Sequence, residues 1–291
     1  MKQSLKISAF KDISAFLLAQ IQQNEAIPLE IKYVKNADEA HEDLKTQQAD
    51  MVLMSYDDTL SIALEDNYSD IAAFLPIHGG MLDLCGTLDL ATGHKRVGID
   101  TNTGYARALR RYLRYQYPND QDYQQLVWIT AGATNIRYEK LRDRQLDATL
   151  LNPPFSYLSD IHQIDSLVTV IGSYQGVVAN LNQSWLNYHN HQSLLKQFIQ
   201  SYQEIIDNMR QNPELTIQKL TDFYQISSQV ATQINQRLWQ SDGLNTAFKF
   251  DNSALAGTEA IFAEDTKIDV PSARSWILDL DLNSDRGQLR N

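Results

Sequence analysis

The chain has 291 residues, which is enough for one large domain or two ordinary ones, and its hydrophobic fraction of 43% supports substantial cores. The formal net charge of −11 argues against a nucleic-acid backbone or an anionic membrane surface as the main partner. No apolar run reaches the length of a membrane span, and a single cysteine excludes an intrachain disulfide.

Predicted strands and helices alternate through the first part of the chain. Strands are expected at 5–10, 29–34 and 51–54, and helices beginning at Asp12 or Ser14 and spanning 37–48. This order predicts a mostly parallel sheet that is covered by helices on both faces.

Two long extended segments are interrupted by proline or glycine. Pro76, Gly79 and Gly80 break the first, at 71–84, and residues 172–176 break the second, at 167–179. We interpret these breaks as two crossings between lobes. The predicted division is residues 1–84 plus 176–291 for the first lobe and 85–175 for the second.

The second lobe and the C-terminal region continue the pattern. Further strands are expected at 97–99, 126–129, 147–151, 167–171 and 177–179, and helices at 105–113, 135–144, after Pro154, and at 194–209, 215–224 and 227–239. The last group has the periodicity of packed helices.

The stretch Val97–Tyr105 reads as a buried strand, a polar turn and a helix start. Thr101, Asn102 and Thr103 are all capable N-caps, so the turn presents hydroxyls and free backbone N–H groups. It is either an ordinary strand-to-helix turn or a site for the most electron-rich group of a ligand, with Arg137 opposite.

Four turns that follow strands share this polar character. They contain Phe10–Asp12, Ser55–Asp58, Thr101–Gly104 and Asn152–Phe155. Ligands of open α/β sheets bind at the carboxyl ends of strands, so these turns are expected to meet around a small molecule.

Several segments carry a family resemblance: Gln48–Asp50 before the 51–54 strand, Val97–Thr101, Ala131–Arg137 and Arg144–Pro154. Together they resemble the substrate-binding proteins of ABC importers for nitrate, sulfonates and thiamine-pyrimidine precursors. The resemblance implies a periplasmic-binding-protein type 2 fold, an α/β architecture with two lobes joined by two crossing strands. It also implies a small polar, anionic or heteroaromatic ligand in the cleft, and an ABC permease as partner.

The candidate ligand-binding residues follow strands or lie at a crossing. They are Phe10, Tyr56, Asp57, His78, Thr101, Asn102, Thr103, Asn135, Arg137, Asn152 and Tyr174.

Each of these candidates has a structural alternative. The tyrosines, Tyr105 included, either stack on a flat ligand or belong to the core. His78 is either a ligand contact or a hinge residue. Arg137 either clamps an anion or forms a surface salt bridge with a neighbour such as Glu139. Asp57 and Asp58 also fit solvated turn positions. The arginines of the 105–113 helix and beyond, Arg107, Arg110, Arg111 and Arg114, are expected on a solvated outer face.

No catalytic set is defensible, and neither a metal nor a cofactor is expected, since His189 and His191 lack a third ligand. The sequence therefore favours a monomeric binding protein without chemistry, membrane insertion or nucleic-acid binding. A cytoplasmic enzyme of thiamine-pyrimidine or other cofactor biosynthesis on the same fold, or a cytoplasmic ligand sensor, is the alternative. With no export signal visible before the first strand, the protein is expected in the cytoplasm, or in the periplasm if a signal was removed.

Overall fold

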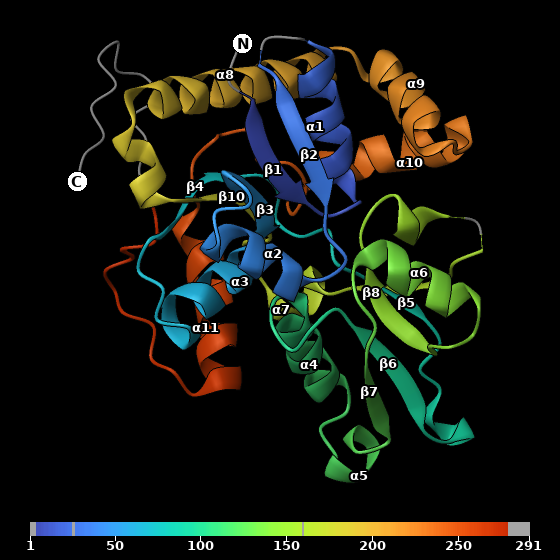
Figure 1. The fold of residues 1–291 in the computed structure, drawn as a ribbon. Coiled ribbons are helices and arrows are strands. Elements are labelled where there is room, and N and C mark those ends of the chain that lie inside the picture. The colour runs from blue at the N-terminus through green and yellow to red at the C-terminus, as the bar shows by residue number, and fades with distance from the viewer. Residues whose placement is uncertain (1–3, 25–26, 159, 279–291) are drawn as a thin grey trace.

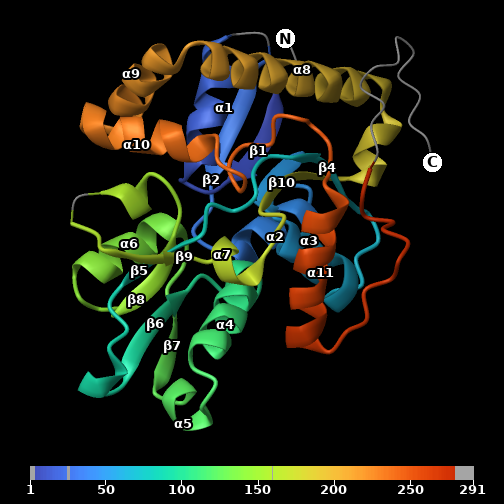
Figure 2. The same ribbon diagram turned by 180° about the vertical axis from the view of Figure 1, so that it is seen from behind.

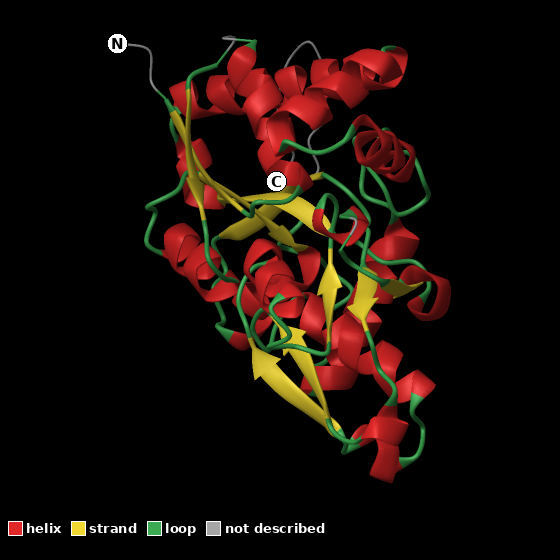
Figure 3. Ribbon diagram, turned by 90° about the vertical axis from the view of Figure 1, so that its right-hand side faces the viewer, coloured by secondary structure: helices red, strands yellow, loops and turns green. Residues whose placement is uncertain are grey.

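The computed structural model describes residues 4–24, 27–158 and 160–278, and it has two lobes, each built on a five-stranded sheet (Figure 1). The first sheet has the order β2-β1-β3-β10-β4 and contains β1 (Leu5–Ala9), β2 (Leu29–Tyr33), β3 (Met51–Ser55), β4 (Ile71–Pro76) and β10 (Val177–Asn182). The second has the order β7-β6-β8-β5-β9 and contains β5 (Asp83–Gly86), β6 (Lys95–Ile99), β7 (Leu126–Thr130), β8 (Ala148–Leu151) and β9 (Gln163–Ser166). In Figure 3 the strands form an upper and a lower group, with helices around both.

Both sheets are mixed rather than mostly parallel. β2, β1 and β3 are parallel, whereas β10 is antiparallel to β3 and to β4. In the second sheet β7, β6 and β8 are parallel, and β5 is antiparallel to β8 and to β9. The reason is topological: β5 and β10 each enter their sheet from the other lobe, so they run opposite to the strands that lead toward it.

Helices cover the faces of both sheets. In the first lobe they are α1 (Ile13–Gln23), α2 (Ala37–Lys45), α3 (Tyr56–Leu60) with a π turn at Ser61–Glu65, α8 (His189–Gln211), α9 (Pro213–Tyr224), α10 (Ser228–Leu238) and α11 (Asn252–Thr266). In the second they are α4 (Tyr105–Gln116), α5 (Asp120–Tyr123), α6 (Thr134–Arg142) and α7 (Val168–Ile171). Short 3-10 turns occur at Leu90–Thr92 and Phe155–Tyr157 in the second lobe and at Gln183–Asn187 in the first. No helix in the described part of the chain is both long enough and apolar enough to cross a bilayer.

The cores show why these segments fold where they do. β3 is buried along its whole length, as a central strand with helices on both faces must be. One face of the first sheet packs against α1 and α8 and the other against α2, α3 and α11, whereas a separate apolar cluster fills the second lobe around α4. The two lobes predicted from the sequence correspond to these sheets; the boundaries at 84 and 176 stay a prediction, and β5 already begins at Asp83.

The two crossings lie directly against each other. The chain leaves the first sheet after Pro76 and returns to it at Val177. A side chain on Gly176 would have its Cβ 2.2 Å from the Gly80 nitrogen, so the two crossings touch through their backbones. The Asn152 side chain, which follows β8, donates a hydrogen bond of 2.6 Å to the Gly80 carbonyl and ties the second lobe to the same point.

Several elements differ from the expectations. The segment 167–171 is not a strand, because Val168–Ile171 form the single turn α7, which ends at Gly172 with φ +81. Helix α11 and strand β9 were not predicted at all. The two helices α3 and α11 lie side by side in Figure 2, where α11 runs down toward the second lobe and α4.

Candidate functional site

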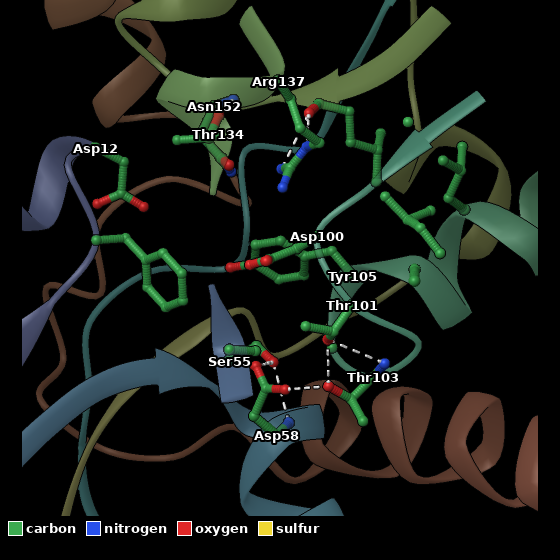
Figure 4. A pocket seen from close by; sticks show the side chains of 18 of the residues that line it. Asp12, Ser55, Asp58, Asp100, Thr101, Thr103, Tyr105, Thr134, Arg137 and Asn152 are labelled. Carbon is green, nitrogen blue, oxygen red and sulfur yellow. Dashed lines mark hydrogen bonds between the residues drawn. The ribbon is translucent and has the colours of Figure 1, made fainter. Parts of the chain in front are cut away.

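A cavity of about 40 Å³ lies between the lobes, where the carboxyl ends of β1, β3, β6 and β8 meet (Figure 4). Its lining residues are Phe10, Asp12, Ala37, Ser55, Asp58, Gly98, Ile99, Asp100, Thr101, Thr103, Gly104, Tyr105, Ala106, Leu109, Thr134, Arg137, Leu150, Asn152 and Val177. Both lobes therefore contribute residues to the lining of this cavity, as we predicted from the polar turns that follow the strands.

Asp12 enters the cavity from the first lobe as the N-cap of α1. Its Oδ1 accepts a hydrogen bond of 2.8 Å from the Ser14 backbone N–H, which fixes the carboxylate at the helix start. The side chain is 4% exposed. Burial raises the pKa of Asp12 to about 6, although the bonds from Ser14 and the charge of Arg137 act in the opposite direction.

Asp58 lies at the start of α3 and is fully engaged by neighbours. It accepts hydrogen bonds from the Ser55 hydroxyl at 2.6 Å and the Thr103 hydroxyl at 2.9 Å, and it contacts His41 Nε2 at 3.2 Å. Burial acts to raise the pKa of Asp58, but these bonds and the charge of His41 outweigh burial and lower it. The bond from Thr103 crosses between the lobes.

Asp100 and Tyr105 enter from the second lobe, directly after β6 and at the start of α4. Within the described residues, Asp100 Oδ1 and the Tyr105 hydroxyl are buried and have no hydrogen-bond partner. Burial raises the pKa of Asp100 to about 7, with the nearby Asp58 carboxylate contributing, while Arg137 opposes the rise. In Figure 4 the Asp100 carboxylate points into the middle of the cavity, in front of the Tyr105 ring.

Arg137 reaches the cavity from α6 and is 4% exposed. Its Nε and Nη2 donate to the Leu150 carbonyl at 3.2 Å, and its Nη1 donates to the Gly132 carbonyl at 2.6 Å. The alternative of a surface salt bridge with Glu139 is therefore wrong. In Figure 4 the guanidinium points into the cavity from the side opposite Asp58.

The turn before α4 is already filled by carboxylates of the first lobe. The Gly104 backbone N–H donates to Asp57 Oδ1 at 2.9 Å, and the Thr103 hydroxyl donates to Asp58. Thr103 N–H bonds to the Thr101 hydroxyl instead of facing an external group. The turn thus binds two carboxylates of the first lobe. Its role as a site for an electron-rich group of a ligand remains a prediction.

The expectation of a solvated arginine face on α4 is wrong for Arg107, which is 3% exposed. Its guanidinium bonds to Asp57 and, at 2.7 Å, to Glu65 of the first lobe, and it lies 4.8 Å from the centre of the Phe262 ring of α11. Asp57 itself is fully buried rather than solvated. Helical periodicity marks the polar face correctly, but it cannot show that a second lobe covers that face.

The cavity brings together part of the predicted set. The predicted residues that line it are Phe10, Thr101, Thr103, Arg137 and Asn152. Asn102 is exposed and Asn135 partly buried, and neither is in the lining. Their roles as ligand contacts remain predictions.

The other four predicted residues lie outside the lining of this cavity. Tyr56 donates to Glu259 and accepts from Trp276, both at 2.8 Å, which ties α11 to α3. Asp57 pairs with Arg107. His78 and Tyr174 border a separate hollow of about 500 Å³, where burial lowers the pKa of His78 to about 3 and its Nδ1 accepts from the Gly80 N–H.

Sequence reasoning did not select several residues that line the cavity, namely Asp12, Ser55, Asp58, Asp100, Tyr105 and Thr134. All of them lie at the end of a strand or in the turn and helix start after it, so the position rule that selected Phe10 and Thr101 could have found them. Asp12 was interpreted only as a helix cap, and Asp58 as a solvated turn residue. Among the described residues, no group of three His, Cys, Asp or Glu side chains is placed to hold a metal ion.

Comparison with known proteins identifies the fold. No family model and no curated protein matches this sequence. The ligand-binding component of an ABC-type import system from Staphylococcus aureus, solved with zinc bound, is 15% identical with a TM-score of 0.75, over 96% of this chain and 97% of that one. The alkanesulfonate-binding protein from Xanthomonas axonopodis pv. citri, bound to MOPS, is 11% identical with a TM-score of 0.71, over 91% and 94%.

A third solved structure carries the fold's name. It is a Candida albicans gene product described as exhibiting the generic periplasmic binding protein structural fold, and it is 14% identical with a TM-score of 0.72, over 97% and 99% of the two chains. At these identities the likeness concerns the fold, and the present chain has the two-lobed periplasmic-binding-protein fold that its sequence predicted.

Proposed function

We propose that this chain is a solute-binding protein that encloses one small polar molecule between its lobes for delivery to an ABC importer. The supporting observation is the composition of the interlobe cavity. Its polar wall combines Asp12 and Asp58 from the first lobe with Asp100 and Arg137 from the second. Charged side chains are rarely buried in such number without a partner that compensates them, so a bound solute gives them a function.

The hinge geometry supports the same proposal. Two short crossings join the lobes, and residues of both lobes line the cavity, so separation of the lobes about these crossings would open it. Closure around a solute removes water from it and orders the turns of both lobes. The closed form then differs in shape from the open form, which is the property a permease needs in order to distinguish loaded from empty protein.

The proposed role places the protein on the outer side of the membrane, where an importer collects its solute. Nothing in the fold or its neighbours supports the cytoplasmic location expected from the sequence. Cell fractionation of the natural host, with the full natural gene product, measures the location directly. Recovery in the cytoplasmic fraction would contradict the importer role and would favour a sensor or an enzyme.

The experiment that tests capture is native mass spectrometry of protein purified without added ligand, followed by denaturation and identification of the released molecule. We expect a stoichiometric small solute, released chemically unchanged, together with a smaller radius of gyration in solution when it is bound. A solute that is converted during incubation would instead indicate an enzyme. Absence of any bound solute, with no change in dimensions across a metabolite panel, would contradict the proposal.

A further inference from the structure

The cavity has more acidic than basic side chains. Among the described residues that line it, Asp12, Asp58 and Asp100 are acidic and Arg137 is basic. Asp58 is compensated by His41 and two hydroxyls. Asp12 and Asp100 therefore share one guanidinium between them, and ionisation of both leaves one negative charge that the cavity itself does not neutralise.

Arg137 does not pair directly with either carboxylate. Three of its five N–H groups donate to the backbone carbonyls of Gly132 and Leu150, which leaves two N–H groups for the cavity. Its charge reaches Asp12 and Asp100 only through space. The guanidinium is thus held in the wall by its carbonyl partners, and each carboxylate keeps acceptor capacity toward the cavity.

Unpartnered oxygens mark where a donor is missing. Asp100 Oδ1 and the Tyr105 hydroxyl are enclosed without a hydrogen-bond partner in the described structure. A buried acceptor without a donor is unfavourable, and more so when it is charged. Both atoms belong to residues that line the cavity, so a molecule inside it can supply the missing N–H groups.

Resting on the function proposed above, we infer that the solute is a small organic cation whose N–H groups donate to Asp100 and Asp12, in place of the anion that the sequence suggested. One positive charge balances the excess carboxylate. The cavity volume of about 40 Å³ limits the charged group in this closed form to a few non-hydrogen atoms. At roughly 10–15 Å³ for one water, it holds about three water-sized groups. Ammonium and amidinium groups fit this description.

Three probes of the same planar shape and different charge separate the alternatives. Guanidinium, urea and nitrate each have four non-hydrogen atoms, a central carbon or nitrogen and three atoms around it. Titration calorimetry and thermal shift with guanidinium chloride, urea and sodium nitrate, at constant ionic strength set by sodium chloride, compare cation, neutral molecule and anion at one site. We expect guanidinium, well below denaturing concentration, to bind and to raise the melting temperature, with urea and nitrate much weaker.

The variants Asp100→Asn and Asp12→Asn assign the effect to the cavity. Both replace a carboxylate by an amide of the same shape, and asparagine at position 12 can still cap α1. Each should weaken guanidinium at least tenfold, whereas Asp143→Asn, a matched change in an exposed ion pair with Arg142, should leave it unchanged. Circular dichroism of each variant establishes that it is folded.

The outcomes separate this inference from the proposed function. Preference for nitrate, equal response to all three probes, no response to guanidinium, or a guanidinium response that survives both variants would each overturn the cation assignment. An anionic or neutral solute recovered by native mass spectrometry would also overturn it, but would leave solute capture intact. Failure of capture would appear instead as the absence of any bound solute and of any lobe movement.

Discussion

The Arg107 guanidinium of the second lobe donates a hydrogen bond to the Asp57 carboxylate of the first, and both side chains are buried, with exposures of 3% and 0%. The same guanidinium also reaches Glu65 and Asp265. A buried charge is costly unless it is paired, so in this arrangement of the lobes each side chain depends on the other, whereas separating the lobes would expose both to water.

Replacement of Arg107 by alanine should therefore act on closure more than on folding. In the closed form it leaves Asp57 buried without its partner, a loss that typically costs about 3–5 kcal/mol. In an open form Asp57 regains water, so the population should shift toward open lobes. Small-angle scattering should show a larger radius of gyration, and solute affinity should fall more than about tenfold. Arg111→Ala, which removes a mostly exposed pair with Glu264, is the control and should change little. Unchanged dimensions in the Arg107 variant would refute this role of the Arg107–Asp57 pair in closure.

Gly104 permits the close approach of α4 to the first lobe. Its φ is +59, and an added Cβ would lie 2.9 Å from Asp58 Oδ2. Gly104→Ala should lower stability by about 1 kcal/mol through its left-handed backbone and should further weaken solute binding by keeping the lobes apart. Gly93→Ala supplies the control, because φ there is +96 but nothing lies within 4 Å. Calorimetry that finds equal solute affinity in both variants would show that closure does not depend on this contact.

The raised pKa values of Asp12 and Asp100, about 6 and 7, predict the pH dependence of the empty protein. Between their ordinary value of 3.8 and these values, the folded state binds more protons than the unfolded state, so the free energy of unfolding contributed by these groups falls as pH rises. The loss is complete above pH 7. At pH 8, Asp100→Asn should hence have a higher melting temperature than the parent, by about 2–4 °C for each kcal/mol regained. At pH 4 the two proteins should have the same melting temperature.

The matching prediction concerns binding. Arg137, Tyr105 and Asp58 face Asp12 and Asp100. Asp12 and Asp100 titrate between pH 5 and 8, with pKa values of about 6 and 7, whereas the pKa of Asp58 is lowered below this range and that of Tyr105 is raised above it. The affinity for guanidinium, which keeps its charge throughout, should consequently rise from pH 5 to pH 8. Isothermal titration across this range measures it. A flat profile would mean that neither carboxyl contacts the probe.

The contact between the crossings predicts an unusual sensitivity at Gly176. Its φ is ordinary, but a Cβ there would overlap the Gly80 backbone. Gly176→Ala should thus destabilise the protein more than Gly172→Ala, which lies in the same crossing at φ +81 with open space around it. Thermal denaturation of the two variants decides this. A lower melting temperature for the Gly172 variant would show that backbone strain, and not crowding, dominates at the hinge.

Much of the fold followed from local patterns. Buried runs such as Met51–Met54 and glycine-interrupted crossings were readable, because strand burial and turn chemistry are local properties of the chain. Antiparallel insertion of β10 was not, because it depends on which lobe the strand enters from. The strand predicted at 167–171 was wrong, because a short β-branched run such as Val168–Ile171 fits a strand or one helical turn equally well.

For the candidate site too, features that depend on local position were predictable, and features that depend on contacts between the lobes were not. Positions after strands predicted Phe10, Thr101 and Arg137 at the cavity, since the topology of parallel strands fixes that edge. The burial of Asp57 and Arg107 was not predictable from either helix alone, because each becomes the partner of the other only when the lobes meet. Charge balance in the cavity likewise depends on how many carboxylates converge there, and this is a property of the assembled structure.

The backbone contact between Gly80 and Gly176 has a consequence for how the protein moves. Two connections that touch at one place, with no side chain between them, share a single pivot. Movement of the lobes about this point is then expected to be a rotation, because sliding one crossing along the other would force the two backbones into each other. If the proposed importer contacts the outer faces of both lobes, the angle between the lobes would accordingly tell it whether the protein is loaded, without any contact with the solute.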